Sequence, residues 1–172
     1  MNRMRSLVAL MALVTVCWGR TLAAQDKEEE SQAAVARAVT SAPVSLEHAL
    51  AASASHGQPI SAKFEIEEGK LQLSVYTVQD GKFFEVIVDY STGKVQQVET
   101  ITEGEDLSAA TAQNAAIAKA KVSLRAAVEQ ALRGSAGFRA VGVTPSVKDG
   151  RAVADVTLAR GEELKAISVP LQ

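Results

Sequence analysis

The side chains best suited to catalysis or metal binding are few in this sequence. Its only histidines, His48 and His56, lie eight positions apart, whereas helical metal-binding pairs are spaced four apart. They could form a loose site with Glu47, but a solvent-exposed helix face is the simpler interpretation. The spacing indicates neither a Ser-His-Asp set nor a phosphate-binding glycine loop. Because a nucleophile needs a base beside it, the residues predict a protein that is not an enzyme and that holds no cofactor or metal ion.

The single cysteine, Cys17, lies in an N-terminal stretch typical of an export signal. Early arginines, a short apolar run and small residues before Ala24 form this pattern. Residues 1–24 are interpreted as a signal peptide, with an uncleaved membrane anchor and a lipidated Cys17 as the alternatives. The run is too short to span a bilayer well, and Val16 is not the small residue that lipidation needs before the cysteine. We therefore expect a periplasmic or secreted mature chain with neither a cysteine nor a membrane span.

The charge of the chain narrows the class of partner. The formal net charge is −2 over 172 residues, and loss of the arginine-containing signal would make the mature chain more acidic. Such a protein is a poor candidate for binding nucleic acid or anionic membrane surfaces. The expected partner is another protein.

An internal repeat indicates which elements position these residues. The segment 44–50 (VSLEHAL) recurs as 122–128 (VSLRAAV). In the first copy Ser45 is a good helix N-cap, and glycine-punctuated strand patterns follow each copy. The repeat predicts two small units.

The first unit follows a charged and partly helical lead over 25–43. Pro43 ends that lead, because the residue before a proline is disfavoured in a helix. A helix over 45–56 is predicted next, followed by three antiparallel strands over 62–67, 70–79 and 82–90. A fourth strand over 95–101 is predicted without a register.

The register of the three strands follows from two hairpin signals, Glu68-Gly69 and Asp80-Gly81. Read independently, both turns place Leu71, Leu73 and Val75 on one apolar face, which a slip of one residue would destroy. The first turn pairs Ile66 with Leu71, Phe64 with Leu73 and Ala62 with Val75. The second pairs Leu71 with Tyr90, Leu73 with Val88, Val75 with Val86 and Thr77 with Phe84.

The second unit is predicted to begin with one long helix over 108–133, because no proline precedes Ser123. A turn at Asp149-Gly150 then pairs two further strands, and a last strand runs over 164–169. The predicted pairs are Val147 with Ala152, Val143 with Val156 and Val141 with Leu158.

The face of the first sheet that is expected to be exposed to solvent carries several large apolar side chains. The predicted pairing places Val78 beside Phe83 and Tyr76 beside Glu85 there. Apolar residues grouped on an exposed face mark contact surfaces. The alternative interpretation is that the loop of the fourth strand, the linker or the second half covers them. The candidate partner face consists of Tyr76, Val78, Phe83 and Ile87.

Residues 44–101 resemble a PepSY domain. The resemblance rests on the segment 84–95 (FEVIVDYSTGKV), a strand that ends in Val-Asp and leads into a Thr-Gly turn, after a helix and an Asp-Gly hairpin. The motif turn contains Asp89, Thr92 and Gly93, for which a structural role is favoured over binding. Residues 108–172 resemble a second, divergent copy that keeps the helix start and a hairpin tip but lacks the closing turn.

The resemblance implies an α+β fold of two tandem units, each a helix packed on a small antiparallel sheet. PepSY domains occur in propeptides of thermolysin-type metallopeptidases and in many exported bacterial proteins, and an inhibitory role toward peptidases has been proposed for them. The tandem arrangement is also similar to that of the β-lactamase inhibitory proteins, although no residue motif carries over.

These observations leave three functions open. The leading hypothesis is an exported, non-catalytic PepSY-type module that binds a protein partner and acts as a peptidase inhibitor or regulator. The second is an assembly protein of the cell envelope, which pairs with another chain through an open strand edge at 164–169. The third is an envelope module that binds a metal or a small ligand.

Overall fold

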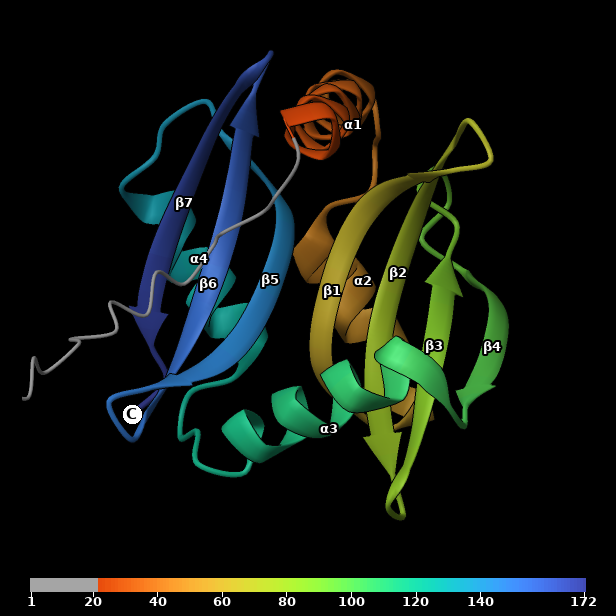
Figure 1. Cartoon of the computed structure of the whole chain (residues 1–172), viewed down its shortest axis with the longest axis vertical. Helices are drawn as coiled ribbons and strands as arrows, with labels where there is room; N and C mark the ends of the chain where they lie inside the picture. Colours follow the sequence, from red (N-terminus) through yellow and green to blue (C-terminus); the bar gives the residue numbers. More distant parts are fainter. Residues whose placement is uncertain (1–21) are drawn as a thin grey trace, which may run out of the picture.

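Seven antiparallel strands form one sheet with helices on both faces (Figure 1). The computed structural model describes residues 22–172, so the predicted signal peptide lies outside the described residues up to position 21. The strand order is β4-β3-β2-β1-β5-β6-β7, which confirms the predicted α+β class. The elements are α1 (Leu22–Thr40), α2 (Leu46–Ala52), the 3-10 helix η1 (Ser53–His56), β1 (Gln58–Glu67), β2 (Lys70–Gln79), β3 (Lys82–Val88), β4 (Val95–Ile101), α3 (Gly104–Ile117), α4 (Leu124–Arg133), β5 (Arg139–Lys148), β6 (Arg151–Arg160) and β7 (Glu163–Pro170).

Tight glycine turns set the register of the first two hairpins. The turn residues Glu68-Gly69 and Asp80-Gly81 all have positive φ, as two-residue hairpin turns require. The three predicted β1–β2 pairs are confirmed, and so are three of the four predicted β2–β3 pairs. Leu73 and Val75 lie fully buried on the shared apolar face.

The fourth predicted pair, Leu71 with Tyr90, is wrong. β3 ends at Val88, because Asp89 begins a turn in which its backbone N–H donates to the carbonyl of Lys94 (2.8 Å). The chain returns as β4, whose bounds match the prediction of a strand over 95–101. A register shift between Ile87 and Val88 explains why residue alternation alone could not predict how β4 pairs.

The second half has one comparable error. The predicted pairs Val147–Ala152 and Val143–Val156 are confirmed, but Leu158 pairs with Ala140 instead of Val141. A bulge at Val141 shifts the register by one residue, and such an insertion carries no turn signal in the sequence. β1 contains the same irregularity, between Pro59 and Ser61.

The predicted continuous helix over 108–133 is also wrong. α3 ends at Ile117 and α4 begins at Leu124, where the Ser123 hydroxyl accepts the N–H of Ala126 (3.2 Å) as an N-cap. Between the helices, the amides of Lys121 and Val122 donate to the carbonyl of Leu171, at 2.6 and 3.2 Å. The break therefore depends on a residue that is distant in the sequence.

The helices divide between the two faces of the sheet. α2 and α4 lie side by side behind it in Figure 1, and α3 crosses in front. Helices this short are marginal alone in water, so packing supplies their stability. The core-facing residues of α2 and α4 are buried: Leu46, Ala49, Leu50, Leu124, Ala127 and Val128.

The two halves of the sheet meet at β1 and β5. Only two residue pairs join these strands, Ala62–Val143 and Lys63–Gly142. α1 contacts both strands at this junction, and the Arg139 side chain donates to the carbonyl of Val44 (3.1 Å). The buried residues accordingly form one cluster that spans both halves.

Candidate functional site

The predicted partner face lies on β2 and β3, on the side of the sheet that faces away from α2 and α4. Val78 lies beside Phe83 and Tyr76 beside Glu85, as predicted. The side chains of Tyr76, Val78, Phe83 and Ile87 are all half-buried. The first three pack partly against the core, whereas Ile87 does not belong to that packing.

Helix α3 covers one side of this face. A small cavity of about 120 Å³ lies between α3 and the strands, and Tyr76, Lys63 and Asp106 are among its lining residues. The Ser61 hydroxyl donates to Oε1 of Gln113 (2.7 Å), which anchors α3 to β1. The face is thus closed beside Tyr76 and open towards Ile87.

The face carries negative charge. Burial, and then the carboxylates of Glu85, Glu65 and Asp106, raise the pKa of Tyr76 above its usual range. The phenol therefore keeps its proton and can act only as a hydrogen-bonding group. Lys63 lies with its Nζ 5.6 Å from the centre of the Tyr76 ring and 2.6 Å from a carboxylate oxygen of Glu65.

Two glutamates on this face lie directly opposite one another. Glu85 of β3 is the cross-strand partner of Glu99 of β4. Like charges in such a position are destabilising by some tenths of a kcal/mol. A positively charged group brought to this surface by a partner would relieve that repulsion.

The motif turn is held together by its own hydrogen bonds. Oδ1 of Asp89 accepts the backbone N–H groups of Ser91 (2.7 Å) and Thr92 (2.9 Å), as well as the Ser91 hydroxyl. The Ser91 hydroxyl, followed by the two backbone N–H groups, lowers the pKa of Asp89. Gly93 has a φ of +75°, and a Cβ there would collide with Nε2 of His48. These contacts hold the backbone of the turn in place.

A notch opens where the motif turn leaves the sheet. Its volume is about 410 Å³, and its walls include Leu71, Leu73, Val88 and Tyr90. Tyr90 is 39% exposed. The notch exists because Leu71 lacks the Tyr90 partner that the alternation pattern predicted.

The two histidines do not come together in a site. The exposed His48 ring lies against Gly93, and His56 ends η1, where its carbonyl accepts the Thr77 hydroxyl (2.9 Å). Within residues 22–172, no three His, Cys, Asp or Glu side chains are placed to hold a metal ion.

A cleft of about 420 Å³ between α2 and the α3–α4 connection was missed at the sequence level. Apolar side chains dominate its walls, with Lys121 and Arg125 as its charged members; the apolar residues are Leu50, Ala51, Ala54, Pro59, Ile117, Ala120, Val122 and Leu124. A continuous helix over 108–133 would leave no such connection. The break at residues 118–123, which the prediction of one continuous helix overlooked, creates the cleft.

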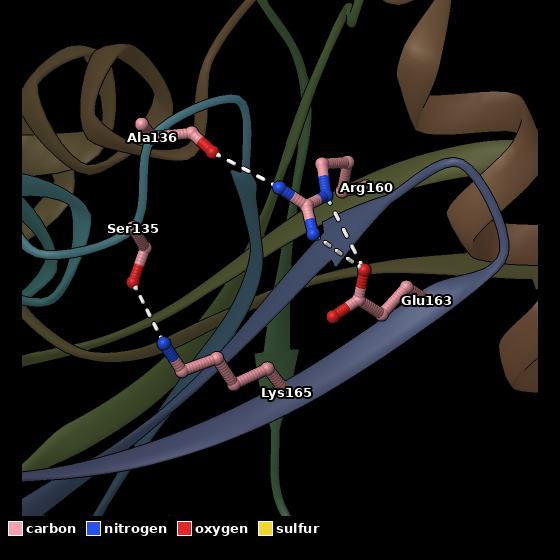
Figure 2. A network of polar contacts seen from close by, with 5 residues as sticks. All are labelled: Ser135, Ala136, Arg160, Glu163 and Lys165. Carbon is pink, nitrogen blue, oxygen red and sulfur yellow. Dashed lines mark hydrogen bonds and ion pairs between the residues drawn. The ribbon is translucent and has the colours of Figure 1, made fainter.

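The loop after α4 is tied to β6 and β7 by a polar network (Figure 2). Arg160 donates to the carboxylate of Glu163 (2.8 Å) and to the carbonyl of Ala136 (3.4 Å), and Lys165 donates to the Ser135 hydroxyl (3.2 Å). Both cations also lie over the ring of Phe138, at 4.4 and 5.6 Å from its centre. The network fixes the charged side chains of β7 to the rest of the second half.

No known protein family, curated protein or solved structure matches the chain. Over residues 22–172, no helix is both long and apolar enough to cross a bilayer.

Proposed function

We propose that this chain is an exported, non-catalytic binding module that recognises a protein partner through Tyr76, Val78, Phe83 and Ile87. The observation that carries the proposal is a group of half-buried apolar side chains on a sheet face that also presents Glu85 and Glu99. Apolar side chains inside a charged surround are typical of a recognition surface. The negative charge favours a partner with basic residues at the contact.

The PepSY resemblance supplies the class of partner in this proposal. Residues 44–101 form the first PepSY-like unit and residues 108–172 the divergent second unit. The partner is then a peptidase, which the module inhibits or regulates. The N-terminal pattern of residues 1–24 supports export, with the periplasm or the extracellular space as the destination.

The junction of the two halves supports the tandem arrangement. Counted back from the turns Glu68-Gly69 and Asp149-Gly150, Ala62 and Val143 occupy the same position in β1 and β5. These equivalent residues are paired with each other. An antiparallel pair of equivalent residues is what an approximate twofold axis normal to the sheet produces.

The test compares one change on each face of the first half. Ile87→Ser changes the member of the partner face that does not pack against the core. Val98→Ser removes a 40% exposed valine that pairs with the buried Val86 on the opposite face. Loss of a central apolar contact costs at least about 1–2 kcal/mol of binding, roughly a tenfold weaker Kd. Phe83→Ser is the stronger variant, but it also removes core packing.

The measurements are inhibition of a thermolysin-type metallopeptidase and capture of partners from an envelope extract. We expect Ile87→Ser to weaken both while Val98→Ser leaves them unchanged, with equal thermal unfolding of the two variants. Equal binding by both variants would remove the assignment of this face.

A second candidate function is assembly through the strand edge of β7. The observation that favours it is the strand order, in which β7 is the last strand on its side of the sheet. Edge strands present backbone N–H and C=O groups that another strand can pair with.

A further inference from the structure

The geometry of β7 points to a specific occupant for this edge. We infer that β7 pairs in antiparallel fashion with β7 of a second copy of the chain. The twofold axis passes midway between the two copies of Ala166, so that these two residues lie opposite each other. The inference rests on the second candidate function, edge pairing, and names its partner and register.

The first half shows which positions of β7 accept a neighbour. β3 and β7 both follow a two-residue turn, so Phe83, Glu85 and Ile87 correspond to Leu164, Ala166 and Ser168. On β3 these residues lie opposite Ile101, Glu99 and Gln97 of β4. Within residues 22–172, no strand occupies the corresponding side of β7.

Backbone geometry directs the same three residues outward. The turn Gly161-Glu162 is flanked by the pair Arg160–Glu163, and in a two-residue hairpin this flanking pair exchanges its backbone hydrogen bonds. Every second residue of β7 therefore bonds to β6. The N–H and C=O groups of Leu164, Ala166 and Ser168 point away from β6, and Ala166 and Ser168 are exposed.

The usual protection of an edge strand is weak here. Charged residues, lysine above all, keep a free edge from pairing. In β7, Glu163 is held by Arg160 (2.8 Å), and Lys165 donates to Ser135 (3.2 Å) (Figure 2). Lys165 also lies over the Phe138 ring. Both charges are thus engaged within their own molecule.

The register follows from the symmetry. A twofold axis normal to the sheet pairs residues of the same face, so it passes midway between one residue and its own copy. With the axis between the two copies of Ala166, a small side chain meets its copy, Leu164 meets Ser168, and no like charges are opposed. An axis between the two copies of Lys165 would oppose two lysines, and an axis between the two copies of Ile167 would place Pro170, which has no N–H, opposite Leu164.

Cysteine crosslinking tests this register directly. In the full chain with Cys17→Ser, the variant Ala166→Cys places two thiols across the axis, where the Cα–Cα distance of about 5.5 Å suits a disulfide. Ser168→Cys is the matched control, because its two copies would lie about 13 Å apart. We expect a covalent dimer from the first variant only, and crosslinking by the second alone overturns the register.

Sedimentation over a concentration series tests the dimer without crosslinking. We expect Ala166→Pro, which removes an outward N–H, to be monomeric, while Ala166→Ser dimerises like the parent. A parent chain that stays monomeric and whose Ala166→Cys variant does not crosslink overturns the inference. Amide exchange then separates the two claims. If the amides of Leu164, Ala166 and Ser168 exchange fast in that monomer, the edge is unpaired and another protein could still pair with it. If they exchange slowly, the edge is already covered, and edge pairing is removed as a function as well.

Discussion

The two halves of the sheet begin alike and close differently. Ser45 and Ser123 each cap a helix by accepting an amide N–H at 3.2 Å. The valine before each serine donates its own N–H to a backbone carbonyl one or two residues after the third strand of its half. Val44 donates to Tyr90 and Val122 to Leu171, both at 3.2 Å.

The two halves differ at the residue whose carbonyl accepts this N–H, which we call the anchor residue: Tyr90 in the first half and Leu171 in the second. In the first half, the Asp89 turn carries the chain away to β4, and Tyr90 remains 39% exposed beside the notch. In the second half, Leu171 is fully buried, and its N–H donates to the carbonyl of Ala152 (3.0 Å). The same backbone anchor therefore serves a strand that gains a further neighbour and a strand that becomes an edge.

The largest expected effect comes from truncating the two anchor side chains. Leu171→Ala should lower the free energy of unfolding by about 3 kcal/mol, because it opens a cavity at a fully buried leucine. Tyr90→Ala should cost less than about 1 kcal/mol, since its side chain is partly exposed and leaves no closed cavity in the core. Urea unfolding of both variants measures the difference. Equal losses of unfolding free energy would mean that Tyr90 and Leu171 contribute equally to stability, and the comparison between the two halves would fail.

A smaller effect is expected at the glycines of two turns. Gly93 and Gly150 both have φ near +75°, so alanine costs about 1–2 kcal/mol at either position. A Cβ at Gly150 meets open space, whereas one at Gly93 meets the His48 ring. Gly93→Ala should thus destabilise more than Gly150→Ala in urea unfolding. Adding His48→Ala should bring the two losses together, and an excess that persists would place the strain elsewhere.

The smallest effect concerns the charge of the motif turn. The folded-state pKa of Asp89 is lowered, so its stabilising contribution is complete above its unfolded pKa of about 3.9 and is lost as the pH falls through the folded value. Asp89→Asn should therefore be less stable than the parent at neutral pH, and the gap should shrink below about pH 4. Unfolding curves across this pH range measure the gap. A gap that does not change with pH would assign the role of Asp89 to geometry alone.

The sequence predicted the parts of this fold that depend on near neighbours. The registers of β1, β2 and β3 followed from two glycine turns and residue alternation, and the bounds of β4 from the next turn signal. One error, the pair Leu71–Tyr90, arose from the local turn at Asp89. The other two involve contacts between segments that are distant in the sequence. The bulge at Val141 carries no local signal, because it only changes a pairing. The break between α3 and α4 has a local signal in the N-cap Ser123, but the chain before it is also held by the carbonyl of Leu171, which is distant in the sequence.

The candidate site divides in the same way. Cross-strand alternation brought Tyr76, Val78, Phe83 and Ile87 to one face, since a strand places every second side chain on the same side. Only the folded chain decided that α3 covers Tyr76 and leaves Ile87 open. It also decided that β1 joins β5. Sequence periodicity specifies which face a side chain takes, whereas the neighbour of that face is chosen by contacts between segments far apart in the chain.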